Sequence, residues 1–315
     1  MATNNKTAVV FAYHNIGVTG LECLLSMGVD VALVVTHEDN QQENIWFDSV
    51  ENIAKLNEIT VIKPENPNVD AVIQAVKDCQ PDWIFSFYYR NMLGADILNI
   101  PALGAFNLHG SLLPKYRGRV PINWAIIKGE NESGISLHRM VTKPDAGNLI
   151  AQKKVAILPN DTAQKVFEKV NSAAEELLLD VIPSLQDNSF KETPLDLNSG
   201  SYFGGRQPKD GQINWALPAQ QIHNLIRAVA PPYPGAFFLV NKTVFTFLGS
   251  YFTDKASTQP LIAGHIRLYW LKNLLRVDCM DGKSLCITQF TCDGVLLDET
   301  QFNNKFGPEL LVKYE

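Results

Sequence analysis

The sequence predicts an α/β protein: a Rossmann-like, mostly parallel sheet in an N-terminal domain, followed by a small C-terminal open β-barrel domain. Three observations predict it. Apolar runs alternate with helix-compatible segments over the first half, a polar stretch rich in Gly, Asn and Ser interrupts the chain, and only short apolar runs follow. Continuous apolar strands are typical of parallel sheets that are buried on both faces. Ligands are expected at the carboxyl ends of such strands.

The N-terminal elements follow from the spacing of apolar residues. Short apolar and β-branched runs predict strands, and longer segments between them suit helices. In chain order we expect a strand at 7–13, a helix at 17–27, strands and helices alternating at 29–36, 46–56, 59–63 and 69–79, and a strand at 82–88. His14, residues 88–90 and His109 follow strand ends, so they are expected to meet at one edge of the sheet.

The second half of the chain has a different pattern of apolar residues. A helix is predicted from a cap at Asn160 to about residue 185, with Pro183 bending or ending it. One helix at 218–229 and short strands at 236–240, 243–251, 260–270, 273–279 and 284–291 then predict an antiparallel, partly open barrel. We therefore expect a catalytic domain at 1–188, a linker at 189–206 and the barrel domain at 207–315.

Composition restricts the class of protein. A hydrophobic content of 46% with 19% charged residues is ordinary for a globular enzyme, and no apolar run is long enough for membrane insertion. The first residues lack the apolar core of a signal peptide, so a cytoplasmic location is expected. A net charge of −6, with Lys and Arg concentrated only at Lys115, Arg117 and Arg119, disfavours a nucleic-acid partner.

One short segment carries the chemistry. Asn107 and His109 follow an apolar stretch and are separated by one residue, so on an extended chain they project from the same face. An amide donor and a titratable ring beside each other suit acyl transfer, which needs an oxyanion donor and a proton acceptor. Asp145 supplies a carboxylate downstream. A structural alternative is that Asn107 caps a turn, His109 is a satisfied turn histidine and Asp145 merely lies in a loop.

These residues stand in a longer pattern, from Phe106 to Arg119 with Asp145 downstream, which resembles the folate-dependent formyltransferases. That family includes formyltransferases for methionyl-tRNA, for glycinamide ribonucleotide and for amino sugars. The pattern is most similar to the formyltransferase domains of bifunctional polymyxin-resistance proteins, which formylate UDP-4-amino-4-deoxy-L-arabinose. The matching stretches are residues 10–14, 84–90, 115–119, 123–124, 137–141, 227–230 and 233–237.

The resemblance implies roles for particular residues. It implies 10-formyltetrahydrofolate as the formyl donor, Asn107 at the oxyanion, His109 handling the proton and Asp145 orienting His109. The donor would be held by Asn91, Met92, Leu93, Arg119, Val141, Thr142, Lys143 and Pro144. A nucleotide-sugar substrate would be held by Ser111, Arg206, Trp215, Asn224 and Arg227. Ser111 could equally cap the turn, and Arg227 could be a solvated residue on a packed helix.

Several alternatives remain open. The glycines at 17 and 20 lack the full dinucleotide-binding spacing, so NAD is not expected, and no cluster has metal-ligand spacing. His138 alternates with Ser136 on a strand, which favours a structural role. The rivals are a formyltransferase for another nucleotide-linked amino sugar, a methionyl-tRNA formyltransferase, and an inactive folate- or nucleotide-binding module. The chain leaves no room for the decarboxylase domain of the bifunctional proteins, so a separate decarboxylase is expected; a homo-oligomer remains possible.

Overall fold

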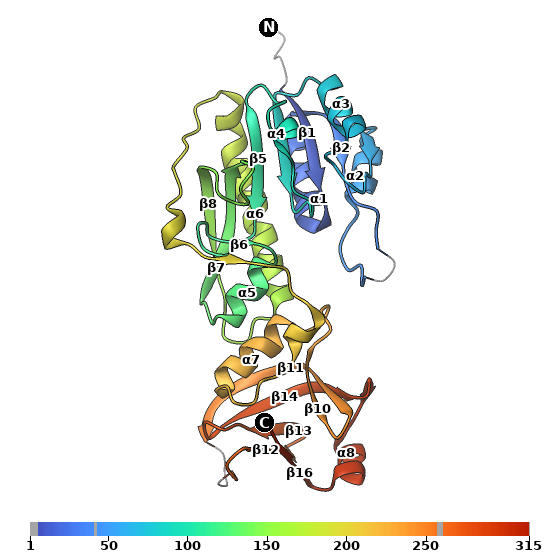
Figure 1. Ribbon diagram of the computed structural model, residues 1–315, viewed down its shortest axis with the longest axis vertical. Coiled ribbons are helices and arrows are strands. Elements are labelled where there is room, and N and C mark those ends of the chain that lie inside the picture. The colour runs from blue at the N-terminus through green and yellow to red at the C-terminus, as the bar shows by residue number, and fades with distance from the viewer. Residues whose placement is uncertain (1–5, 41–42, 257–260, 315) are drawn as a thin grey trace. The chain divides into compact units, whose positions relative to one another are not determined.

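A computed structural model of the chain describes residues 6–40, 43–256 and 261–314 (Figure 1). Residues 1–5, on which the expectation about a signal peptide depends, and residue 260 of a predicted strand lie outside the described residues. The chain divides into two compact units, each described here by itself. The first unit comprises Met1–Pro121, Ser133–Val155 and Glu168–Gly204, and the second comprises Ile122–Glu132, Ala156–Phe167 and Gly205–Glu315.

The first unit is built on a seven-stranded sheet with the order β3-β2-β1-β4-β5-β7-β8. The pairs from β3 to β5 are parallel, and β7 runs antiparallel to β5. The strands are β1 (Thr7–Ala12), β2 (Asp30–Val35), β3 (Thr60–Ile62), β4 (Trp83–Phe87), β5 (Gly104–His109), β7 (Glu132–Arg139) and β8 (Leu149–Ala156). The predicted mostly parallel sheet is therefore confirmed.

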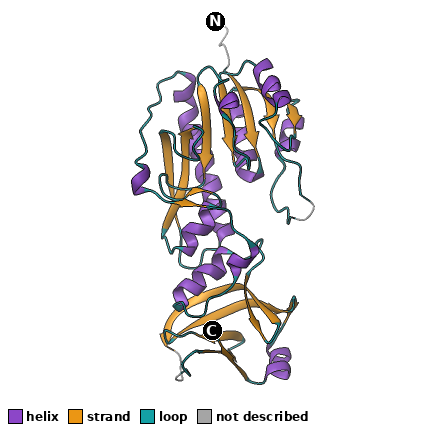
Figure 2. Ribbon diagram, in the orientation of Figure 1, coloured by secondary structure: helices purple, strands orange, loops and turns teal. Residues whose placement is uncertain are grey.

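Helices separate the parallel strands (Figure 2). They are α1 (His14–Ser26), α2 (Val50–Leu56), α3 (Asp70–Asp78) and α4 (Ala95–Leu98). A longer helix, α6 (Ala163–Gln186), follows β8 and has residues in both units. The helix predicted at 46–56 begins only at α2, because the Ser49 side chain caps it by accepting the Asn52 N–H. Pro183 does not end α6, which continues to Gln186. Among the described residues, no helix is both long and apolar enough to cross a membrane.

A small two-stranded parallel sheet also lies in the first unit. It joins β6 (Arg117–Gly118), just after the Asn107-to-Pro114 segment, to β9 (Tyr202–Phe203). β9 belongs to the stretch whose composition predicts a linker, and two 3₁₀ turns, Leu197–Ser199 and Pro208–Gly211, flank it. The loop after β5 is therefore hydrogen-bonded to a segment more than eighty residues away in sequence, such as Tyr116 to Ser201.

The second unit contains an antiparallel sheet with the order β10-β11-β14-β13-β12-β16, and β15 pairs with β14. Its strands are β10 (Ala236–Val240), β11 (Thr243–Ala256), β12 (His265–Leu271), β13 (Leu274–Asp278), β14 (Lys283–Cys292), β15 (Val295–Leu296) and β16 (Glu309–Lys313). Its other helices are α5 (Pro121–Ile127), α7 (Ala219–Ala228) and α8 (Glu299–Phe306). Register shifts in β11 near Gly249 bend the strand, and the open barrel that the sequence predicts is confirmed.

The packing of α1 on the sheet generates a test of the first unit. A Cβ added at Gly20 would lie 2.4 Å from the ring of Phe87, which is fully buried in β4. Gly20→Ala is therefore expected to lower the free energy of unfolding by about 1–2 kcal/mol, despite the gain in helix propensity. Urea denaturation measures the change.

Gly204→Ala is the matched control, because a Cβ there meets nothing within 4 Å. Equal stability of the two variants would contradict the close packing of α1 on β4.

Candidate active site

The site is centred on β5, in the interior of the sheet. β5 pairs with β4 on one side and with β7 on the other, so neighbours on both sides fix its register. Asn107 lies opposite His138 of β7, and His109 lies opposite Ser136. Asn107 and His109 both contact Asp145, so they point to the same face, as their alternation predicts.

Asp145 lies in the loop that connects β7 to β8. The loop is closed at its base, where the Arg139 N–H donates to the Asn148 carbonyl at 2.8 Å. The chains approach so closely there that a Cβ on Gly147 would lie 2.0 Å from the Arg139 carbonyl oxygen. Asp145 itself has a φ of 46°, a left-handed conformation uncommon outside glycine. This local geometry turns the Asp145 carboxylate back towards β5.

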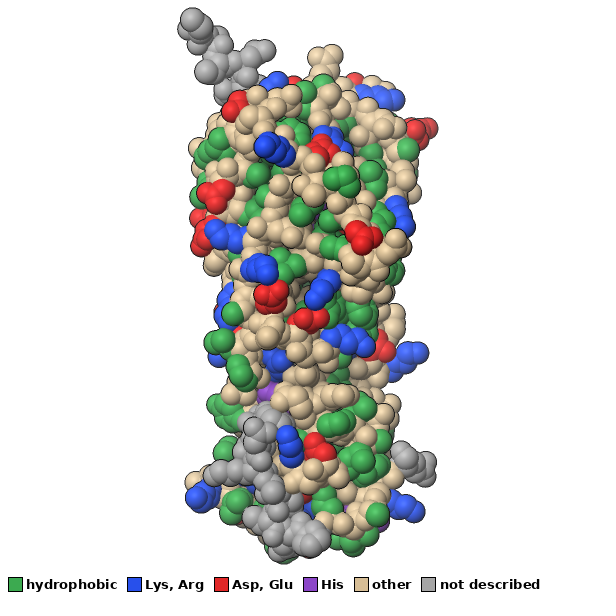
Figure 3. All heavy atoms as spheres, turned by 90° about the vertical axis from the view of Figure 1, so that its left-hand side faces the viewer, with side chains coloured by type: hydrophobic (Ala, Val, Ile, Leu, Met, Phe, Trp, Pro, Cys, Tyr) green, Lys and Arg blue, Asp and Glu red, His purple; other side chains and the backbone are tan. Residues whose placement is uncertain are grey.

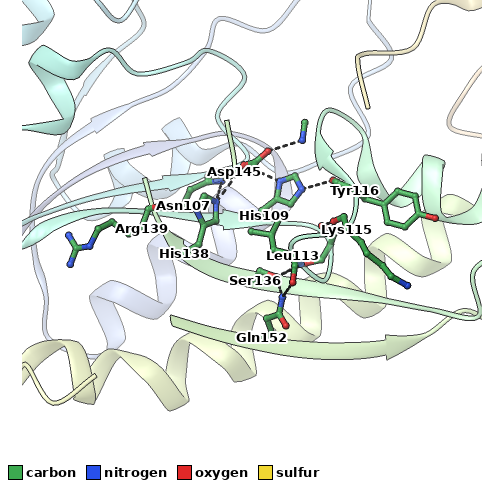
Figure 4. A network of polar contacts seen from close by, with 12 residues as sticks. Asn107, His109, Leu113, Lys115, Tyr116, Ser136, His138, Arg139, Asp145 and Gln152 are labelled. Carbon is green, nitrogen blue, oxygen red and sulfur yellow. Dashed lines mark hydrogen bonds and ion pairs between the residues drawn. The ribbon is translucent and has the colours of Figure 1, made fainter. Parts of the chain in front are cut away.

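The Asp145 carboxylate is the centre of the site (Figure 4). Its Oδ1 lies 3.3 Å from Asn107 Nδ2 and 3.5 Å from both His109 Nδ1 and His138 Nε2. Its Oδ2 accepts the backbone N–H of Gly118 at 2.8 Å. Only 11% of the side chain is exposed. One carboxylate therefore joins three polar side chains and the loop after β5.

These neighbours determine the ionisation of Asp145. Burial by itself raises the pKa of a carboxyl group, because it disfavours the charged form. The His109 and His138 rings and the Gly118 N–H outweigh burial, and they hold the pKa of Asp145 well below its usual range. Asp145 is therefore a fixed negative charge at neutral pH.

The His109 ring has a defined orientation. Its Nε2 lies 2.9 Å from the carbonyl oxygen of Tyr116, and a carbonyl oxygen can only accept. Nε2 therefore carries a proton, and Nδ1 is the nitrogen that faces Asp145.

His138 is a site residue that the sequence analysis assigned to a structural role. Its Nδ1 donates to the Arg139 carbonyl, so Nε2 accepts an N–H from Asn107 Nδ2 at 3.0 Å. That bond fixes the orientation of the Asn107 amide. The signal that identifies His138 is its register opposite Asn107, which exists only once β5 and β7 pair.

A network of hydroxyl groups shapes the turn after β5 (Figure 4). The buried Ser111 Oγ donates to the Lys115 carbonyl at 2.7 Å, and Ser136 Oγ donates to the Ser111 carbonyl at 2.6 Å. Gln152 Nε2 in turn donates to Ser136 Oγ and to the Leu113 carbonyl. The Ser111 hydroxyl is thus used within the turn.

The two arginines after this turn have different environments. Arg117 is only 9% exposed, and its Nε has no hydrogen-bond partner among the residues that the structure describes. Arg119 is exposed, and its backbone N–H donates to the Phe203 carbonyl. Of the two, Arg119 can contact a ligand by a side-chain motion alone.

The residues expected to hold the formyl donor lie in two loops of the first unit. Asn68 fixes the loop after β4, since its side chain donates to the Met92 carbonyl at 2.9 Å and accepts the Gly94 N–H at 2.6 Å. The Asn91 side chain donates to the Glu65 carbonyl, Met92 is 53% exposed and Leu93 is buried. In the second loop, residues 141–143 are exposed and Pro144 is half-buried.

Residues that follow different strands do meet at the carboxyl edge. The ring of His14, after β1, lies 6.3 Å from that of Tyr88, after β4. A Cβ on Gly110, after β5, would lie 2.1 Å from the Tyr88 hydroxyl oxygen. Tyr88 thus lies between the end of β1 and the turn after β5.

The other residues expected at the acceptor lie in the second unit. Trp215 is 5% exposed and packs against Phe238 in its hydrophobic core. Arg227, also 5% exposed, donates to the carbonyls of Leu158 and Asp161 and to Asn224 Oδ1. These contacts use Asn224 and Arg227 to hold α7 against the residues before α6.

Arg206 differs from Asn224 and Arg227. It is half-buried, its Nη2 donates to the Asp210 carbonyl at 2.9 Å, and its guanidinium lies 5.9 Å from the ring centre of Trp124. Its Nε, like the Nε1 of Trp215, is a buried donor without a partner among the described residues. Burial lowers the pKa of Arg206, because it disfavours the charged form. Within the described part of the chain, the polar groups of Arg206 are therefore only partly satisfied.

The chain matches the models of a known family of enzymes. A family model described as formyl transferase matches residues 19–182, and a model described as the formyl transferase C-terminal domain matches residues 206–306. The chain therefore belongs to the formyl transferase family and is an enzyme that transfers one-carbon units.

Solved structures of sugar formyltransferases share the fold. WlaRD, a sugar 3N-formyl transferase crystallised with dTDP and 5-N-formyl-THF, is 22% identical with a TM-score of 0.66, over 90% of this chain and 97% of that one. The N-formyltransferase from Helicobacter canadensis, in complex with folinic acid and dTDP-3-aminofucose, is 24% identical with a TM-score of 0.66, over 90% and 98%. A 4-N formyltransferase from Francisella tularensis is 21% identical with a TM-score of 0.62, over 75% and 93%.

The buried histidine of α7 generates a pH prediction for the second unit. His223 is fully buried, with Nε2 near the Pro159 carbonyl and Nδ1 near Ser250 Oγ. Burial lowers the pKa of His223 from 6.5 to about 4. Between these values the unfolded chain binds a proton that the folded chain does not, so stability falls as the pH falls.

We expect His223→Gln to remove on the order of 2–3 kcal/mol of the pH dependence of unfolding over this interval. Urea denaturation at several pH values measures it. The control is His265→Gln, on a partly exposed histidine of the same unit. An unchanged pH dependence in the His223 variant would contradict the assignment of a neutral buried ring.

Proposed function

We propose that the chain transfers the formyl group of 10-formyltetrahydrofolate to the 4-amino group of UDP-4-amino-4-deoxy-L-arabinose. The observation that carries the proposal is the Asp145 carboxylate, which lies within 3.5 Å of Asn107 and of His109. Membership of the formyl transferase family supports the reaction class. The sequence resemblance to the polymyxin-resistance formyltransferases supports the acceptor.

The roles of the three residues follow from their contacts. The acceptor amine attacks the formyl carbon, and negative charge develops on the formyl oxygen. Asn107 has two N–H groups on Nδ2: His138 takes one at 3.0 Å, and the other makes a longer contact of 3.3 Å with Asp145. Since Asp145 keeps the Gly118 N–H as a donor, the second N–H of Asn107 can turn to the formyl oxygen.

His109 accounts for the proton. In its neutral form Nε2 carries the hydrogen held by Tyr116, so Nδ1 accepts the proton that the attacking amine loses. Asp145 and the Tyr116 carbonyl stabilise the resulting cation. The bond between the formyl carbon and the folate nitrogen then breaks, and that nitrogen receives the proton. The products are the formamide and tetrahydrofolate.

The donor and acceptor sites belong to the same proposal. Asn91, Met92 and Leu93 with the loop at 141–144 hold the pteridine ring, and Arg119 contacts the donor. In the second unit, Arg206 is the better candidate for the nucleotide sugar, because its Nε has no partner among the described residues, whereas the contacts of Arg227 are made within the unit. Folinic acid and 5-N-formyl-THF in the two similar structures are consistent with a folate donor.

A second candidate acceptor is another nucleotide-linked amino sugar. The Helicobacter canadensis structure contains dTDP-3-aminofucose, and WlaRD is a sugar 3N-formyl transferase. For the first candidate, the cellular role is lipid A modification, with the transfer taking place in the cytoplasm. A tRNA acceptor has less support, since acidic and basic side chains are interspersed on the face in Figure 3.

The proposal is tested with purified protein, 10-formyltetrahydrofolate and a panel of amines. The panel contains UDP-4-amino-4-deoxy-L-arabinose, dTDP-3-aminofucose and methionyl initiator tRNA. We expect the mass of the UDP sugar to increase by one CO group. In His109→Ala the rate should fall by about 100- to 10,000-fold, because the proton acceptor is lost.

Each other outcome has a definite meaning. Formylation of only the dTDP sugar would preserve the chemistry and replace the acceptor. Formylation of only the tRNA would replace the substrate class. If no amine is formylated although the folate binds, the chain is a binding module and the proposal fails.

A further prediction concerns the charge of Asp145. Asp145→Asn keeps the shape of the side chain but removes the charge that stabilises protonated His109. We expect kcat to fall by at least about 100-fold with the KM of both substrates nearly unchanged. Steady-state kinetics measures both parameters, and a variant with wild-type kcat would contradict the role given to this carboxylate.

A further inference from the structure

The segment at residues 200–203, just before the second unit begins, is hydrogen-bonded along its length to the loop at 114–119. The Ser201 N–H donates to the Pro114 carbonyl at 3.2 Å, and the Ser201 carbonyl accepts the Arg117 N–H at 3.0 Å. The Phe203 carbonyl accepts the Arg119 N–H at 2.9 Å. These contacts form the small β6–β9 sheet and all lie in the first unit.

Side chains add to this pairing. Ser201 Oγ accepts the backbone N–H of Tyr116 at 2.8 Å. The rings of Tyr116 and Phe203 are stacked, with 5.3 Å between their centroids and an angle of 14° between their planes. Gly200 lies so close to the loop that a Cβ there would be 2.3 Å from the Pro114 carbonyl oxygen. The segment thus holds Tyr116 by both its backbone and its ring.

The loop that is held in this way supplies two backbone groups to the site. The Tyr116 carbonyl accepts from His109 Nε2 at 2.9 Å, and the Gly118 N–H donates to Asp145 Oδ2 at 2.8 Å. Tyr116 both contacts the segment at 200–203 and reaches His109, and Gly118, which reaches Asp145, lies between Arg117 and Arg119, which pair with the segment. A shift of this loop would move both backbone groups at once.

We propose that residues 200–203 are a positioning clamp for formyl transfer, with Ser201 as its central positioning residue. The inference rests on the proposed function for its catalytic consequence. Ser201 acts through the Tyr116 backbone and does not touch the reacting atoms. The clamp keeps the Tyr116 carbonyl and the Gly118 N–H where they fix the proton-bearing nitrogen of His109 and the charge of Asp145.

Two matched pairs of substitutions test the clamp. Ser201→Ala removes the acceptor for the Tyr116 N–H, whereas Ser199→Ala removes a hydroxyl that donates to the Asp196 carbonyl, away from the loop at 114–119. Gly200→Ala forces the segment away from Pro114, whereas Gly204→Ala places its Cβ in open space. Ser201→Thr keeps a hydroxyl and serves as the rescue variant.

The first readout is hydrogen exchange of the whole protein, which does not depend on the reaction. We expect the amides of Tyr116, Arg117 and Arg119 to exchange at least about tenfold faster in Ser201→Ala and Gly200→Ala, because opening becomes more frequent. The Ser199, Gly204 and Ser201→Thr variants should exchange like the wild type. Unchanged exchange in both test variants would overturn the clamp.

The second readout is the kinetics of the reaction. With the acceptor that the wild type formylates, kcat should fall by about five- to tenfold in Ser201→Ala, with unchanged KM values and recovery in Ser201→Thr. Faster exchange with an unchanged kcat would overturn the positioning role. If the wild type formylates nothing, the proposed function fails, while the exchange result still decides whether the clamp exists.

Discussion

The structure of the site depends on one buried carboxylate. Burial of a charged Asp145 is unfavourable unless hydrogen-bond donors surround it. Asn107 of β5 and the Gly118 backbone donate to it, and the rings of His109 on β5 and His138 on β7 lie 3.5 Å away. The carboxylate is satisfied only when both strands and the loop are in place. The charge of Asp145 and the positions of its neighbours are therefore determined together.

The backbone around Asp145 brings the neighbouring groups within reach of its carboxylate. Antiparallel pairing of β5 with β7 places His138 opposite Asn107, and Gly147 allows the chain to return closely enough for Asp145 to face them. On the other side, β9 holds the loop whose Tyr116 carbonyl orients His109. Segments far apart in sequence thus fix the positions of the same few atoms. Acyl transfer needs such preorganised groups, because charge develops during the reaction.

The buried polar residues of α7 in the second unit are satisfied by the same principle but for a different purpose. Arg227 donates to Asn224 and to the Asp161 carbonyl, and His223 lies within hydrogen-bond distance of Ser250 Oγ and the Pro159 carbonyl. Such contacts hold the unit together. The Nε of Arg206 and the Nε1 of Trp215, by contrast, have no partner among the described residues. This difference between satisfied and unsatisfied polar groups guides the search for acceptor contacts.

The sequence by itself determined the fold class, because continuous apolar strands alternating with helices can be buried only in a mostly parallel sheet. It also placed Asn107 and His109 on one face, since alternation along a strand is a local property. Only tertiary structure decided that His138 contacts Asn107, that Tyr116 holds the His109 ring and that the segment around Ser201 pairs with the catalytic loop. These contacts join residues distant in sequence, so they depend on strand register and loop closure, which local patterns do not encode.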